Sequence, residues 1–229
     1  MKIISNHIVE AIALITAVWN YRYIKNTRYV YFIPVLAFIL LGELGGVYFA
    51  NPPNLSVAKN SHIYLSLAMV QFIFYGYMFY QIIHSKRMKQ IIFIGTSVIL
   101  LLLAIWLFFF DKISVPLTIT NGVAGFFFSC VSCFYLYEKS ITPTQTEESL
   151  FGNPDFWFAI GILIFRVTAT IPFLLYFFLS KNQILFLGKP LYHFFPQVFS
   201  VVLYGCFTIA IILWRKKALL TASENKTAQ

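Results

Sequence analysis

Seven apolar stretches, each about the length of a membrane-spanning helix, divide this chain. They cover approximately residues 4–21, 30–50, 63–83, 91–110, 115–137, 156–180 and 191–214. A bilayer core about 30 Å thick requires roughly 20 apolar residues of α-helix. The run from Ile99 to Phe110 is apolar at every position, which is typical of a helix surrounded by lipid and other helices rather than of an alternating strand. The sequence therefore predicts an all-α integral membrane protein, a seven-helix transmembrane bundle.

The composition agrees with a membrane protein. Hydrophobic residues make up 59% of the chain and charged residues 11%, whereas about a quarter of a typical soluble domain is charged. One soluble domain of 229 residues cannot bury this much apolar surface, because a substantial part of a small globule faces solvent. We expect a transmembrane domain at 1–217 and a disordered cytoplasmic tail at 218–229. The stretch 4–21 is expected to be a retained helix rather than a signal peptide, because Glu10 interrupts it.

The basic residues predict the orientation of the bundle. Eleven lie in one set of alternate loops and five in the opposite set. The first set is Arg22, Lys25, Arg28, Lys86, Arg87, Lys89, Lys139, Arg215, Lys216, Lys217 and Lys226, and the second is Lys2, Lys59, Lys112, Lys181 and Lys189. Because basic loops tend to stay in the cytoplasm, we expect the N-terminus outside and the C-terminus inside a bacterial inner membrane.

The net charge of +9 indicates contact with membrane lipids rather than nucleic acid. The basic residues form short clusters at helix ends, where each gains about 1 kcal/mol from anionic headgroups. No cofactor or metal is predicted: Cys130 and Cys133 have a metal-like spacing, but 115–137 has no His or acidic residue. We expect these two cysteines to pack against a neighbouring helix. Cys206 also falls within a predicted span. A retinal protein is excluded because 191–214 contains no lysine.

Arg166 is the one basic residue that falls inside a predicted span. It lies near the bilayer midplane, where insertion of a charged side chain costs roughly 2.5–3.5 kcal/mol. Such a charge needs a partner. We predict a buried ion pair between Arg166 and Glu43, with Glu10 as the second choice of carboxylate.

Further polar residues are expected at a similar depth, entering from the outer side. They are Tyr64, Gln71 and Tyr75 in 63–83, Asn121 in 115–137, and His193 and Gln197 in 191–214. With Arg166, Glu43 and Glu10 they form a candidate pocket open to the outside, as ligand sites between bundle helices commonly are. The alternative is that these groups only bond to one another and hold the helices together, at about 0.6 kcal/mol per bond.

Small residues and prolines predict local helix geometry. Gly42 and Gly46 are spaced so that another helix can approach 30–50 closely. Pro172 and Pro196 fall inside spans and are expected to bend their helices.

Two segments resemble an uncharacterised multi-pass membrane family common in Bacteroidetes. The first runs from His62 through Gln71–Tyr75 to Lys89, and the second is Asn153–Phe165. Family members also occur as the membrane region of sensor histidine kinases, so the resemblance implies a sensor that acts through a protein partner. It carries over no catalytic residues. The chain departs from the family pattern at Gln71, where an acidic residue is common, and at Arg166, where Tyr is usual.

We expect a sensory or signalling membrane domain that binds a small ligand or lipid near Arg166 and Glu43. The first alternative is a transporter of a small solute or lipid, which needs a polar path to the cytoplasmic side, where the spans offer little beyond Tyr77, Tyr80 and Gln81. The second alternative is an intramembrane lipid-modifying enzyme. Its outer-side candidates are Glu10, His62 and His193, which form no recognisable catalytic set. An enzyme is therefore not expected.

Overall fold

The computed structural model describes residues 5–50, 57–109, 114–141, 150–182, 185–186 and 189–227, and nearly all of them are helical. The long helices are α1 (Ser5–Trp19), α3 (Phe32–Ala50), α4 (Val57–Ile82), α5 (Lys86–Phe109), α6 (Ser114–Ile141), α7 (Pro154–Leu174) and α9 (Leu191–Thr227). Shorter elements connect them: α2 (Tyr21–Ile24), η1 (Arg28–Tyr31), η2 (Leu150–Gly152), α8 (Tyr176–Lys181), and a small antiparallel hairpin of β1 (Leu185–Phe186) and β2 (Lys189–Pro190).

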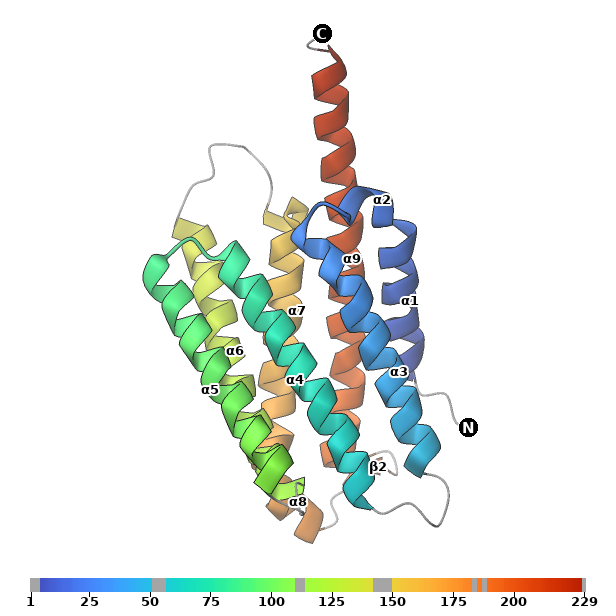
Figure 1. The fold of residues 1–229 in the computed structure, drawn as a ribbon, viewed down its shortest axis with the longest axis vertical. Helices are drawn as coiled ribbons and strands as arrows, with labels where there is room; N and C mark the ends of the chain where they lie inside the picture. The colour runs from blue at the N-terminus through green and yellow to red at the C-terminus, as the bar shows by residue number, and fades with distance from the viewer. Residues whose placement is uncertain are drawn as a thin grey trace.

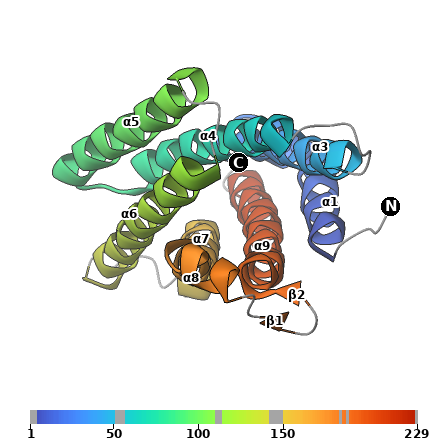
Figure 2. The same cartoon turned by 90° about the horizontal axis from the view of Figure 1, so that it is seen from below.

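The long helices stand side by side in a closed ring (Figures 1 and 2). Each packs against the next in chain order, from α1 and α3 through α4, α5, α6 and α7 to α9, and α9 closes the ring against α1. Across the ring, α4 also contacts α6. Short connections between antiparallel neighbours produce this order. The C-terminal part of α9 projects beyond the other helices (Figure 1).

Within the described residues, six helices are long and apolar enough to cross a membrane. The qualifying segments are Arg28–Gly46, His62–Ile82, Lys86–Phe109, Thr118–Ile141, Pro154–Pro172 and Phe194–Thr221, while Asn6–Trp19 is a shorter apolar helix. The outward faces carry large apolar side chains such as Phe93, Leu101 and Phe108, which are 67%, 61% and 78% exposed. Apolar surface on this scale is typical of contact with lipid. The chain is thus a helical, multi-pass membrane bundle, as predicted.

Aromatic rings fill the centre of the bundle. Phe32, Phe74, Phe158 and Phe207 come from α3, α4, α7 and α9, and all four are buried. Ring centroids lie 4.9 Å apart for Phe32 and Phe74, 5.0 Å for Phe32 and Phe207, and 5.6 Å for Phe158 and Phe207. Such pairs add about 0.5–1.5 kcal/mol each beyond the area they bury. This aromatic cluster therefore ties four helices to a common centre.

The helix boundaries differ from the sequence prediction in two places. The predicted span 156–180 is two helices, because α7 ends at Leu174 and α8 begins at Tyr176. Pro172 has no N–H for the helical bond to the carbonyl four residues earlier, so the helix is weakened just before this break. The predicted disordered tail at 218–229 is wrong over 218–227, since α9 is helical to Thr227. Lys216, Ala218 and Leu219 are strong helix formers that extend an existing helix without a new nucleus.

The cysteines also differ from the prediction. Cys130 and Cys133 are exposed on α6, contrary to the predicted packing against a neighbouring helix, and Cys206 in α9 is buried. Hydrophobicity alone does not tell which face of a membrane helix is turned toward lipid.

Glycines bring pairs of helices into close contact. A Cβ at Gly42 would lie 2.5 Å from the Leu67 side chain, so the predicted close approach at Gly42 is present, against α4. A Cβ at Gly161 would lie 2.7 Å from the Cβ of Cys206 and 3.5 Å from the carbonyl oxygen of Leu203. A Cβ is fixed to the backbone and cannot be rotated away. The close approach of the α7 and α9 backbones at Gly161 therefore requires a residue without a side chain.

We predict that Gly161→Ala lowers the free energy of unfolding by about 1–3 kcal/mol, because overpacking forces α7 and α9 apart. Gly205→Ala on α9 is the matched control, since a Cβ there meets nothing within 4 Å. The measurement is thermal unfolding of the purified protein in detergent. Equal melting temperatures for Gly161→Ala and Gly205→Ala would contradict the close packing.

Candidate functional site

Two carboxyl groups meet between α1 and α3. Glu10 on α1 is fully buried, and its carboxyl group interacts with that of Glu43 on α3. The side chain of Glu43 is 22% exposed. Asn6 Nδ2 donates a hydrogen bond to Glu43 Oε2 at 2.9 Å, and His7 Nδ1 lies 3.0 Å from Asn6 Oδ1 and 3.9 Å from Glu43 Oε2. Asn6, His7 and Glu10 share one face because they lie one turn apart on α1.

Arg166 lies in an aromatic environment between α7 and α4. It is 4% exposed, and its Nη2 donates to Gln71 Oε1 at 3.3 Å. The guanidinium carbon lies 4.8 Å from the ring centroid of Phe72, 5.1 Å from Tyr75 and 5.3 Å from Phe165. A cation beside aromatic faces gains about 2 kcal/mol or more when it is removed from water. Arg166 Nε has no hydrogen-bond partner among the described residues.

Tyr204 on α9 joins these two groups. It is buried, and it interacts electrostatically with Glu10 and Glu43 on one side and with Tyr75 and Arg166 on the other. We call the whole set the polar chain: Asn6, His7, Glu43, Glu10, Tyr204, Tyr75, Arg166 and Gln71. It draws side chains from α1, α3, α4, α7 and α9. A ring of helices thus has a polar connection across its interior at the depth of Arg166.

The predicted ion pair between Arg166 and Glu43 is not formed, and neither is the second choice with Glu10. Glu43 is in contact with Asn6 and His7, and within the described ranges no carboxylate forms an ion pair with Arg166. The physical reason is lateral placement: Glu43 lies on α3 and Arg166 on α7, and Tyr204 interacts with both. The sequence gives the depth of each residue along the membrane normal. It does not give the direction in which the side chain points around the helix axis.

The remaining predicted site residues take different places. Tyr64 is 42% exposed but interacts electrostatically with Glu43. Asn121 on α6 is half-buried and makes no described hydrogen bond to Arg166 or to the two carboxylates. Gln197 is half-buried in α9, about two turns before Tyr204. The side chain of His193 lies outside the described residues. The structure therefore brings together Arg166, Gln71 and Tyr75, and separately Glu10, Glu43 and Tyr64.

Sequence reasoning missed Asn6, His7 and Tyr204. Asn6 and His7 precede Glu10 by about one helical turn, and this spacing could have placed them beside the carboxylates. Tyr204 carried no such signal, because tyrosine is common in this chain.

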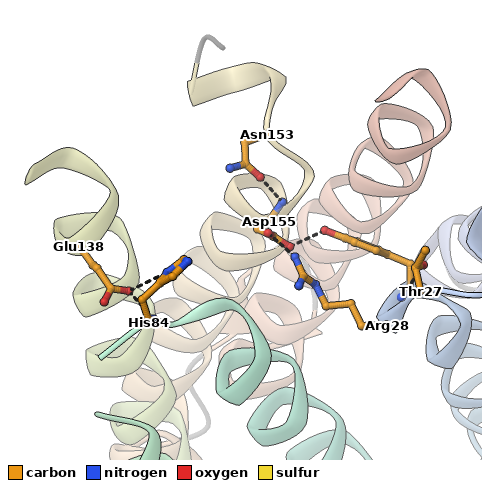
Figure 3. Close-up of polar contacts among 7 residues, drawn as sticks. Thr27, Arg28, His84, Glu138, Asn153 and Asp155 are labelled. Atoms are coloured by element: carbon orange, nitrogen blue, oxygen red, sulfur yellow. Dashed lines mark hydrogen bonds and ion pairs between the residues drawn. The ribbon is translucent and has the colours of Figure 1, made fainter. Parts of the chain in front are cut away.

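A second polar cluster lies at the end of the bundle where α7 begins (Figure 3). Asp155 accepts hydrogen bonds from Arg28 Nη2 at 2.5 Å and from the Tyr29 hydroxyl at 2.6 Å, and its own N–H donates to Asn153 Oδ1 at 2.9 Å. The Tyr29 ring lies 4.8 Å from that of Trp214 on α9. Asp155 lies in the first turn of α7, where its charge complements the helix dipole, and it also ties α7 to η1 and, through Tyr29, to α9.

Glu138 makes a related contact in the same view (Figure 3). Its carboxylate accepts hydrogen bonds from the backbone N–H groups of His84 at 3.0 Å and Ser85 at 2.9 Å. These donors lie just before α5, so Glu138 on α6 anchors the connection between α4 and α5.

We predict that Asp155→Asn lowers the free energy of unfolding by about 1.5–3 kcal/mol, because it removes a charged acceptor from a part-buried arginine. In an Arg28→Met background, Asp155→Asn is expected to lower the free energy of unfolding by less, because the charge that Asp155 balances is then absent. The measurement is a double-mutant cycle of unfolding in detergent. A coupling energy of zero would refute the Arg28–Asp155 contact.

No protein-family model, curated protein or solved structure matches this chain. Within the described residues, no group of three or more His, Cys, Asp or Glu side chains is placed to hold a metal ion. The arrangement itself can do two things chemically. Arg166 can bind an anion, and the two carboxyl groups can take up a proton.

Proposed function

We propose that this protein is a sensory membrane domain that binds a small anionic ligand, or an anionic lipid headgroup, beside Arg166 and signals through a protein partner. Asn153–Phe165 resembles a multi-pass membrane family whose members also occur as the membrane region of sensor histidine kinases, and this resemblance supports the same interpretation. The proposed setting is a bacterial inner membrane, crossed seven times, with the N-terminus outside and the C-terminus in the cytoplasm.

One observation carries the proposal: Arg166 is buried within a span and has no carboxylate in ion-pair contact in the described structure. Its hydrogen-bond partner is the neutral amide of Gln71. A buried charge without a counter-charge costs several kcal/mol. A carboxylate or phosphate on a ligand would supply the missing charge and bond to the Nε and Nη atoms together, which is the geometry that a guanidinium favours.

The aromatic cluster favours a sensor over a transporter. Phe158 lies between Asp155 and Arg166 on α7, and Phe207 lies one turn beyond Tyr204 on α9. With Phe32 and Phe74 they form an apolar layer between the polar chain and the cluster at Asp155. Transport of a polar solute needs a path through this layer, whereas a sensor does not.

Helix α9 offers a route for the signal. It carries Tyr204 of the polar chain and continues unbroken to Thr227, about 35 Å further along the helix axis. Its last turns project from the bundle (Figure 1), where a partner can reach them. A ligand that interacts differently with two positions of α9 would shift the balance between them, and the projecting end would report the shift.

The proposed topology rests on charge and helix length. Helix α1 has 15 residues, or about 22 Å, so it crosses only if the membrane is thinned or its ends extend. The excess of basic residues in the loops at the C-terminal side of the bundle supports a cytoplasmic C-terminus.

We predict that green fluorescent protein fused after residue 229 fluoresces in a bacterial host and that alkaline phosphatase fused there is inactive, because the first folds in the cytoplasm and the second outside it. An N-terminal epitope is expected to be accessible in intact spheroplasts. Reversed reporter results would overturn the orientation, and both ends on one side would exclude seven crossings.

We predict that the wild-type protein, purified in mild detergent, retains an anionic small molecule or lipid that Arg166→Met loses and Arg166→Lys keeps in part. Arg215→Met is the matched control, because Arg215 also lies against an aromatic ring, at 5.6 Å from Tyr23, but outside the polar chain. The measurement is mass spectrometry of extracted ligands and lipids, with melting temperatures to show that each variant is folded. Identical profiles for wild type and Arg166→Met would count against the site.

A further inference from the structure

We propose that the Glu10–Glu43 pair is a proton-binding site, in which the two carboxyl groups share one proton at neutral pH. This site is separate from the anion site at Arg166, and it stands whether or not an anionic ligand binds there.

The contact between the two carboxyl groups lacks a donor. Both oxygens of Glu10 are buried and accept no hydrogen bond from the described residues, although the carboxyl of Glu43 and the hydroxyl of Tyr204 are close by. Two ionised carboxylates repel each other strongly in a low dielectric, so only one of them can carry a charge. A proton on Glu10 turns its carboxyl into a donor toward Glu43 and thereby satisfies both groups.

The groups that face the pair do not balance two negative charges. Helix α1 contributes His7 and α3 contributes Glu43 itself, while α4 and α9 contribute the neutral phenols of Tyr64, Tyr75 and Tyr204. On α7, Arg166 interacts with Tyr204 and Tyr75 and forms no ion pair with either carboxylate. Helix α2 follows the opposite end of α1. Among the described residues, the one cation close enough to help is His7, and only when it is protonated.

The two carboxyl groups differ in their exposure to solvent, and this difference indicates the route by which a proton reaches the pair. Glu10 is fully buried, whereas the Glu43 side chain is 22% exposed and in contact with Asn6 and His7. His7 Nε2 is buried and without a partner among the described residues. A proton therefore reaches Glu10 by way of Glu43, with His7 beside it as a second titratable group.

Loss of the shared proton adds one negative charge to the polar chain. Tyr204, which interacts with both carboxyl groups and with Arg166, would respond to this charge. Since Tyr204 is on α9, protonation of the pair is placed to affect the helix that projects from the bundle.

The test is the pH dependence of thermal unfolding between pH 7 and 9. In this range an unfolded glutamate, with an ordinary pKa near 4.3, holds no proton, whereas the folded pair holds one. Stability therefore falls as pH rises, by up to tenfold in the folding equilibrium per pH unit while the folded pair still holds the proton, and it levels off once the proton is lost. Glu10→Gln and Glu43→Gln remove the shared proton and are expected to flatten the curve. Glu138→Gln, a carboxylate outside the pair, should run parallel to wild type, and His7→Gln separates any contribution of the imidazole.

Infrared spectroscopy of the wild-type protein provides a second measurement that needs no folded variant. A carboxylic-acid C=O band present at pH 7 and lost when the pair ionises is the expected result, and isotope exchange in D₂O should shift it. The absence of such a band at pH 7, or a Glu10→Gln unfolding curve with the same pH dependence as wild type, would overturn the proposal.

Discussion

The charge of Arg166 must be stabilised inside an apolar bundle, and the interior of the ring is arranged around this requirement. The guanidinium is stabilised by three aromatic faces and one amide oxygen rather than by a carboxylate. These contacts draw α4 against α7, and Tyr204 extends the polar connection through α9 to Glu10 and Glu43. Buried polar contacts of this kind favour one packing of the helices over others, because any rearrangement leaves a charge without partners.

Helix α9 connects the polar chain, the aromatic cluster and the polar cluster at Asp155. It contacts α1 and α7, carries Tyr204 of the polar chain and Phe207 of the aromatic cluster, and packs Trp214 against Tyr29 beside Asp155. Its close contact with Gly161 of α7 leaves little room for independent movement of the two helices. In the proposed sensor, a change in charge near Tyr204 would therefore move α7 and α9 together rather than α9 alone.

The membrane fold could be predicted from the sequence because long apolar runs and helix length follow directly from bilayer thickness. Gln71 and Tyr75 could be predicted at the depth of Arg166 by counting along each helix, and both lie beside its guanidinium. The pairing of Arg166 with Glu43 is wrong, because hydropathy does not give the rotation of one helix against the next. Tyr204 is an apolar ring with one hydroxyl, and nothing in its sequence context separates it from tyrosines that face lipid. The polarity of the residues beyond 217 predicts disorder, but their helix propensity allows α9 to continue to Thr227.

The most direct test is a high-resolution density map of the protein in a lipid nanodisc at neutral pH. We expect Arg166 against Gln71 and the rings of Phe72 and Tyr75, Glu10 facing Glu43 without Arg166 between them, and non-protein density beside the guanidinium. A direct, bidentate ion pair between Arg166 and either Glu43 or Glu10 would contradict it, because the arginine would then need no anion from outside the chain.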